Sequence, residues 1–168
     1  AILVVDPDAM LPFPAMGQLG MPIFAGVGSA SVPDVSEAIS QYRLAWREAG
    51  HPGDGDVMLR LGIYVAEDLD RALSEPREST MTYYNRVRRG LIRTADSFGG
   101  ERRALRAQRL ADLTYEDALQ DRLVYGTPET VANRLAELRD ELGLSGIIME
   151  PNVGGRIPPD QVSNSSHL

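Results

Sequence analysis

The strongest constraint on the fold is a single segment, Val57 to Val65, that is apolar on both of its sides. Successive side chains of a β-strand point to opposite sides of a sheet. One side of this segment is wholly aliphatic, and the other is interrupted by one charge, Arg60. A strand that is apolar on both sides needs cover on both sides, which is typical of a parallel sheet enclosed by helices. We therefore expect a central, buried strand at residues 57–65.

Three shorter apolar runs, at residues 2–5, 22–26 and 146–150, are separated from this strand by segments with helical spacing. One helix is predicted from Pro33 to the residue before Gly50, and a second from Pro128 to the residue before Gly143. Strands that alternate with helices indicate an α/β fold with four parallel strands.

The remaining segments carry weaker signals. Residues 68–93 are expected to be helical with a disturbance at Pro76, and residues 101–124 to form short helices joined by mobile turns. The stretch from Gln161 to Leu168 shows no apolar stripe, so we expect it to trail off without a regular element.

Composition excludes several classes of chemistry. The chain has no cysteine, and all 17 basic residues are arginine, so disulfides, thiolate chemistry and lysine Schiff bases are ruled out. The net charge of −7 argues against nucleic acid and anionic membranes as partners. The two histidines, His51 and His167, lack further ligands at metal-binding spacing, so no metal is expected. Without a long apolar run or a signal peptide, the protein is predicted to be cytoplasmic.

Polar residues follow the predicted strands where parallel sheets and barrels hold their ligands, at the carboxyl ends. Tyr64 and Glu67 follow the long strand, and Glu150 and Asn152 follow the last one. Each is a candidate for a site, with a purely structural role as the alternative. Arg60 lies at the opposite end of its strand, where we expect a buried, paired arginine that serves stability.

The segment Gly26-Val27-Gly28 lies between a strand and a helix, where backbone amides can hold a phosphate. It lacks the third glycine of the dinucleotide-binding fingerprint, so a plain loop is the alternative.

Eight of the 17 arginines fall within residues 86–109. They form either an anion-binding flap, in which Arg86 and Arg89 would take part, or a solvated face paired with nearby acids.

Several segments, taken in order, resemble the luciferase-like monooxygenase family of flavin- and deazaflavin-dependent oxidoreductases. They are Leu19-Gly-Met-Pro-Ile-Phe24, Tyr42-Arg-Leu-Ala-Trp-Arg-Glu-Ala-Gly-His-Pro-Gly53, Val65-Ala-Glu-Asp68, Glu75-Pro-Arg-Glu-Ser-Thr80, Gly126-Thr-Pro-Glu-Thr130 and Leu142-Gly-Leu-Ser-Gly-Ile-Ile148. The resemblance implies a (β/α)8 TIM barrel, which takes about 250 residues. The 168 residues here would then be the C-terminal half, about four β/α units, beginning at a cut edge.

The resemblance also implies cofactors and partners. The whole enzyme would oxidise a small organic substrate with reduced FMN and O₂, or transfer a hydride with coenzyme F420, and a flavin reductase would be a further partner. The chain would pair with the missing N-terminal half or form a homo-oligomer, and residues 86–124 would act as a mobile lid. Because the family's catalytic residues lie in the other half, none can be assigned, and the isolated segment should be inactive.

The resemblance places candidate residues in two groups. The cofactor group is Asp6, Asp8, Ala9, Gly26 and Val27, although the two aspartates oppose a phosphate. The substrate and lid group is Tyr64, Glu67, Arg86, Arg89, Glu150 and Asn152. The alternative function is a non-catalytic half-barrel that binds or assembles with another chain through its open sheet.

Overall fold

The computed structural model describes residues 3–5, 13–28, 30–94 and 100–168, and, of these, not the side chains of residues 3–5, 102 and 103. The chain divides into two compact units. The first unit comprises Ala1–Leu61 and Ala132–Met149, and the second comprises Gly62–Val131 and Glu150–Leu168. The predicted long strand, β3 (Val57–Val65), is present and runs from the first unit into the second.

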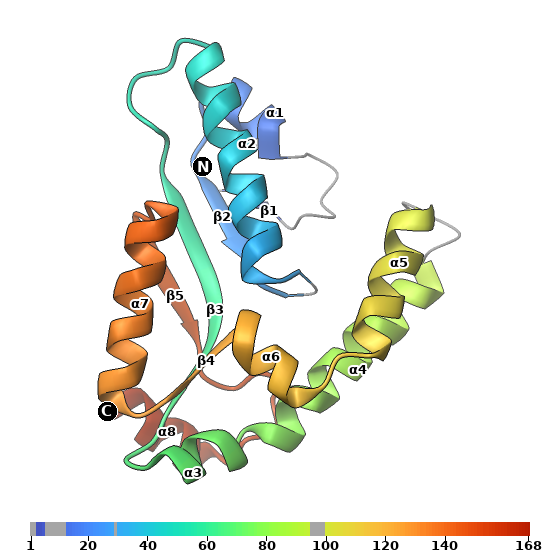
Figure 1. The fold of residues 1–168 in the computed structure, drawn as a ribbon, viewed down its shortest axis with the longest axis vertical. Helices are drawn as coiled ribbons and strands as arrows, with labels where there is room; N and C mark the ends of the chain where they lie inside the picture. Colours follow the sequence, from blue (N-terminus) through green and yellow to red (C-terminus); the bar gives the residue numbers. More distant parts are fainter. Residues whose placement is uncertain (1–2, 6–12, 29, 95–99) are drawn as a thin grey trace. The chain divides into compact units, whose positions relative to one another are not determined.

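In the first unit, parallel pairing begins with β1 (Leu3–Val5) and β2 (Ile23–Gly26), in the register Leu3↔Ile23. The next parallel pair joins β2 to the first part of β3, in the register Ile23↔Val57. The strand β5 (Gly146–Glu150) also pairs with β3, and the Ser145 N–H donates to the Val57 carbonyl at 2.9 Å. The four predicted strands and their alternation with helices are therefore confirmed (Figure 1).

Two helices of the first unit lie side by side, α1 (Phe13–Gln18) and α2 (Val32–Glu48) (Figure 1). A Cβ on Gly17 would lie 2.2 Å from the Tyr42 carbonyl oxygen, so the close approach of the two helices needs this glycine. Ser31 begins α2 with a capping box to Asp34.

The tryptophan of the chain, Trp46, is anchored beside the turn that follows α2. Its indole N–H donates to the Pro52 carbonyl at 3.1 Å. Its ring packs on His51, with 5.0 Å between ring centroids. His51 also contacts the Gln18 carbonyl through Nε2 at 3.0 Å, so this histidine connects the turn after α2 to the end of α1.

Among the described residues, the two faces of the sheet in the first unit differ in burial. Ile23, Ala25 and Leu59 are at most 1% exposed, whereas Phe24 and Met58 are half-buried. Arg60 is exposed, so the expectation of a buried arginine is wrong. The cover that the sequence predicted for both faces is found from Leu61 to Val65, in the residues that continue into the second unit.

In the second unit, β3 pairs in parallel with a strand that the sequence did not predict, β4 (Leu123–Gly126), in the register Gly62↔Leu123. Its apolar run is too short to stand out, and it directly precedes the expected start of α7 (Pro128–Leu142). Pairing with β3 makes it a strand. The other elements of this unit are α3 (Leu69–Ser74), α4 (Arg77–Thr94), α5 (Gly100–Ala111), α6 (Tyr115–Asp121) and α8 (Pro159–His167).

The helices α4 and α5 lie side by side as a hairpin (Figure 1). The break at Pro76 and the short helices expected after residue 101 are both confirmed. The hairpin and β4 share a core whose buried members are Tyr84, Leu91, Ala107, Leu110, Ala118, Leu123 and Val153. No helix in the described residues is both long and apolar enough to cross a membrane.

The C-terminal helix α8 corrects the expectation of an unstructured tail. Its packed face combines one apolar residue, Val162, with the polar Ser165, so apolar periodicity did not reveal it. Ser165 is 2% exposed, and its hydroxyl oxygen accepts the Val65 N–H at 2.8 Å. This hydrogen bond connects α8 to the end of β3.

We expect Ser165→Ala to lower the free energy of unfolding by about 1–3 kcal/mol, because the buried Val65 N–H loses its acceptor. Ser166→Ala is the matched control, since the exposed Ser166 hydroxyl donates only to the Val162 carbonyl of its own helix. Urea denaturation of both variants measures the difference. Equal midpoints for the two variants would contradict this role of Ser165.

Candidate functional site

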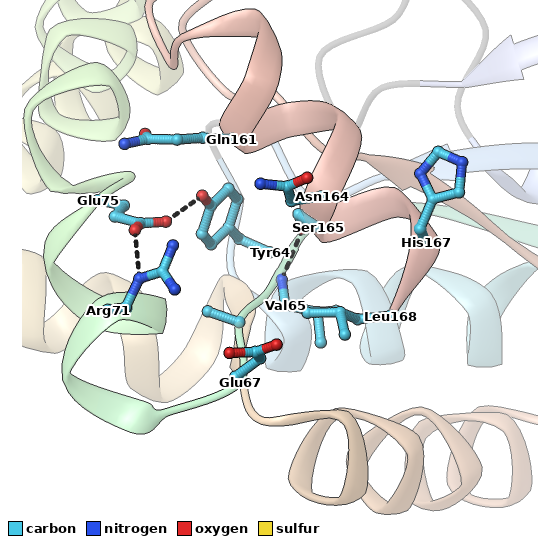
Figure 2. Close-up of a pocket in the computed structure, with 11 residues that line it drawn as sticks. Tyr64, Val65, Glu67, Arg71, Glu75, Gln161, Asn164, Ser165, His167 and Leu168 are labelled. Atoms are coloured by element: carbon cyan, nitrogen blue, oxygen red, sulfur yellow. Dashed lines mark hydrogen bonds and ion pairs between the residues drawn. The ribbon is translucent and has the colours of Figure 1, made fainter.

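A cavity of about 300 Å³ lies at the carboxyl end of β3, within the second unit (Figure 2). Its walls come from β3, from α3 and the residues beside it, and from α8. The lining residues are Tyr64, Val65, Ala66, Glu67, Arg71, Glu75, Gln161, Asn164, Ser165, His167 and Leu168. The volume is at the lower end of the range for small-molecule sites, roughly 300–1,000 Å³.

One wall of the cavity is a chain of three polar side chains (Figure 2). The Tyr64 hydroxyl donates to Glu75 Oε2 at 2.5 Å, and Arg71 Nε donates to Glu75 Oε1 at 2.8 Å. Each carboxylate oxygen of Glu75 therefore has its own donor. Tyr64 lies on β3, Arg71 lies on α3, and Glu75 is the C-cap residue of α3.

The protonation of Tyr64 is fixed by its surroundings. Burial, followed by the hydrogen bond and the negative charge of Glu75, raises the pKa of Tyr64 well above its ordinary value. The phenol consequently stays protonated throughout the neutral range. Tyr64 acts here as a permanent donor to Glu75, and its oxygen keeps a free lone pair for an additional donor.

The opposite wall is formed by α8. Gln161 and Asn164 share the side of the helix that lines the cavity, and neither amide makes a hydrogen bond within the described part of the chain. Figure 2 shows Gln161 reaching from α8 toward the α3 side of the cavity. His167 also lies along the rim, where Nδ1 contacts the Ser163 carbonyl at 2.6 Å.

Metal-ligating side chains do not gather at this cavity. Among the residues described by the structure, no group of three histidine, aspartate or glutamate residues could hold a metal ion.

The structure brings two of the six predicted substrate and lid residues into the cavity, Tyr64 and Glu67. The Asn152 amide is used at both ends, accepting the Ile157 N–H at 3.0 Å and donating to the Ile157 carbonyl at 3.3 Å. It closes the loop after β5. The charge of Glu150 acts on Tyr84 and Tyr125, outside the cavity lining.

The predicted lid arginines lie on α4, away from the cavity lining. Arg86 and Arg89 are exposed, and the Arg86 guanidinium lies 5.8 Å from the ring centroid of Tyr83. Arg122 is a buried arginine of this unit, 7% exposed and ion-paired with Asp121 at 3.3 Å. This burial could not be predicted from local pattern, because Arg122 lies between a short helix, α6, and the unpredicted strand β4.

The predicted phosphate cradle after β2 belongs to the first unit. The Val27 N–H already donates to the Arg60 carbonyl at 3.1 Å. The Asp34 carboxylate accepts from the Ser31 N–H at 3.0 Å at the start of α2, so a negative charge occupies the helix end that would attract a phosphate. Gly26 leaves open space where a Cβ would stand, but it supplies no cation.

The described residues at this loop therefore do not fit the phosphate of a flavin or of coenzyme F420. The other predicted cofactor residues, Asp6, Asp8 and Ala9, lie outside the described residues.

Comparison with known protein families shows to which family the chain belongs. Residues 14–146 match the family described as luciferase-like monooxygenase, so the chain belongs to that family. The suspected resemblance is thereby confirmed. No curated protein matches the chain significantly.

Solved structures support the same fold. The oxygenating constituent of 3,6-diketocamphane monooxygenase from Pseudomonas putida, in complex with FMN, is 15% identical with a TM-score of 0.65, over 96% of this chain and 44% of its own. The coenzyme F420-dependent tetrahydromethanopterin reductase from Methanopyrus kandleri is 16% identical with a TM-score of 0.58, over 96% and 47%. Monooxygenase RslO1 from Streptomyces bottropensis is 21% identical with a TM-score of 0.57, over 98% and 45%.

The chain thus spans less than half the length of these three structures. The neighbours are TIM-barrel enzymes, so the predicted fold class, α/β with parallel strands of the TIM-barrel type, is confirmed.

The site residues that sequence analysis missed are Arg71, Glu75, Gln161 and Asn164. The signal that could have found the last two is the spacing of polar residues along α8.

Four tyrosines of the second unit should make the free energy of unfolding fall as the pH becomes alkaline. Burial raises the pKa of Tyr64, Tyr84, Tyr115 and Tyr125 above the ordinary tyrosine value. Their contribution is complete below the unfolded pKa of about 10 and is lost as the pH rises toward the higher folded values. Urea midpoints at about pH 9 and about pH 11, followed with tyrosinate absorbance, should show this fall, and Tyr64→Phe should reduce it.

Proposed function

We propose that this chain is the C-terminal half of a flavin- or coenzyme F420-dependent oxidoreductase that acts on a small organic substrate. The family match over residues 14–146 carries the proposal. The parallel succession β1, β2, β3, together with β5 paired to β3, supports it, because these strands stand in the order expected of consecutive barrel strands. The whole enzyme would work with a flavin reductase when the cofactor is FMN.

The cofactor and the residues of this chain would have different roles. A bound reduced flavin would supply electrons for oxidation of the substrate by O₂, whereas coenzyme F420 would exchange a hydride with the substrate. In this chain, Tyr64 and Glu67 would face the substrate side at the carboxyl end of β3. Arg86 and Arg89 would belong to a lid formed by residues 86–124. The cofactor phosphate would be held elsewhere than at the loop after β2.

The test is a direct assay of the 168-residue chain. In a coupled assay with a flavin reductase, FMN and O₂, we expect no NADH consumption beyond that of the reductase alone, and no quenching of FMN fluorescence, because the chain would supply only half of the barrel mouth. A full-length family member assayed in parallel shows that the conditions support turnover. Robust oxidation by the isolated chain would contradict the half-barrel proposal.

A second candidate function rests on the less buried face of the sheet in the first unit. Phe24 and Met58 are half-buried although the residues beside them in the strands are covered. A partly exposed apolar sheet face favours association. The chain would then serve as a non-catalytic assembly module that forms a homo-oligomer through this face.

The oligomeric state distinguishes this candidate. Light scattering coupled to size-exclusion chromatography should show a defined dimer that Met58→Asp abolishes. Leu44→Asp is the matched control, since Leu44 is 51% exposed on the outer side of α2 and should leave the dimer intact. Circular dichroism checks that both variants fold. A monomeric wild-type chain would rule out assembly through this face.

A further inference from the structure

The second half of α4 carries four arginines and no acidic residue: Arg86, Arg88, Arg89 and Arg93. Three of them, Arg86, Arg89 and Arg93, follow the i, i+3, i+7 spacing of one helix face, and all three are exposed. This face lies opposite the residues of α4 that pack in the core shared with β4. We call Arg86, Arg89 and Arg93 the arginine stripe.

The arginine stripe lacks acidic partners. On α7, by contrast, Arg134 pairs with Glu137 at 2.9 Å. Within the described residues, no side chain of the stripe forms an ion pair or a hydrogen bond, and Arg86 contacts only the ring of Tyr83. The solvated face paired with nearby acids, which was one of the two interpretations of the sequence, is therefore not found for the stripe.

The arrangement of these charges opposes the helix that carries them. Arg86 and Arg89 stand at i, i+3 and Arg89 and Arg93 at i, i+4, and like charges at these spacings destabilise a helix. The helix dipole favours Arg93, which lies in the last turn of α4, but its effect fades beyond that turn. A partner surface of negative charge would relieve the repulsion along the whole stripe.

The second unit also presents a surface of the opposite sign, at the start of α3. Glu67, Asp68 and Asp70 are all exposed there. Asp68 caps the helix, whereas Glu67 and Asp70 form no hydrogen bond or ion pair in the described part of the chain. The basic residue that follows, Arg71, is already paired with Glu75 at 2.8 Å. We call Glu67, Asp68 and Asp70 the acidic patch.

An exposed aliphatic side chain accompanies each of these two surfaces. Ile92, beside Arg93 in the sequence, is 53% exposed, and Leu69, beside Asp70, is 51% exposed. Arginine is enriched in protein–protein interfaces, whose centres are apolar. A nucleic acid would instead be repelled by a chain with a net charge of −7. The two surfaces therefore favour a protein as the partner of the arginine stripe.

We propose that two copies of this chain associate through the second unit, with the arginine stripe of each copy on the acidic patch of the other. The stripe carries three positive charges and the patch three negative charges, so the two surfaces complement each other. Both surfaces belong to the same unit, and a twofold axis makes their two contacts equivalent. This interface is separate from the sheet face of the first unit, and it does not depend on the oxidoreductase function.

The first test is sedimentation velocity of the wild-type chain at about 0.01 M and about 1 M NaCl, between which the Debye length falls from roughly 30 Å to 3 Å. We expect a dimer at low salt that is lost at high salt, because the contacts join exposed charges. Association through the apolar sheet face of the first unit would persist at high salt. An assembly state that does not change with salt would overturn the proposal.

A charge exchange tests which residues make the contact. Arg86→Glu with Arg89→Glu reverses the stripe, and Glu67→Arg with Asp70→Arg reverses the patch. Each double variant alone should lose the low-salt dimer, because like charges then face each other. An equimolar mixture of the two should restore it, since the reversed stripe meets the reversed patch and the second contact stays native. A mixture that remains monomeric would overturn the proposal.

Arg134→Glu with Arg139→Glu is the matched control, because it makes the same change of charge on α7, in the first unit. This variant should keep the low-salt dimer, and circular dichroism checks that all variants fold. Heparin serves as a polyanion probe. If heparin binding required Arg86 and Arg89 while the mixture of reversed variants stayed monomeric, the stripe would be a polyanion site and the dimer would be ruled out.

Discussion

The parallel hydrogen bonding of β3 is the interaction on which the rest of the structure depends. Its first part pairs with β2 and its second part with β4, and β5 pairs with it as well. At its carboxyl end, the Val65 N–H has a side chain, Ser165, as its acceptor. A buried amide must have a partner, so the end of the strand determines where α8 can lie. The cavity exists because that helix is held there.

The sequence predicted the parts of the fold that local pattern controls. Alternation of apolar residues from Val57 to Val65 identified β3, and the glycine and proline signals around α2 and α7 identified those helices. It failed for β4, whose strand character comes from its partner rather than from its own four residues. It also failed for α8, because a helix whose packed face combines Val162 with the polar Ser165 shows little of the periodicity on which such predictions rely.

The candidate site could be predicted only in part, for a related reason. Position at the end of a strand correctly indicated Tyr64 and Glu67, since parallel strands bring their carboxyl ends together. Glu75 and Gln161, which also line the cavity, come from segments whose positions depend on tertiary packing. The predicted phosphate cradle after β2 is an instructive contrast. Its glycines are present, but the Val27 amide is used within the sheet and Asp34 occupies the helix end.

The anchoring of Trp46 has a practical consequence. It is the single tryptophan of the chain, and it belongs to the first unit, whereas Tyr64, Tyr84, Tyr115 and Tyr125 belong to the second. Each unit therefore carries its own intrinsic chromophore. Indole fluorescence follows the loss of the first unit, and near-ultraviolet tyrosine signals are dominated by the second. Superimposable curves at the two wavelengths would make the chain one cooperative folding unit, and separated curves would make β3 a strand that can be half unfolded.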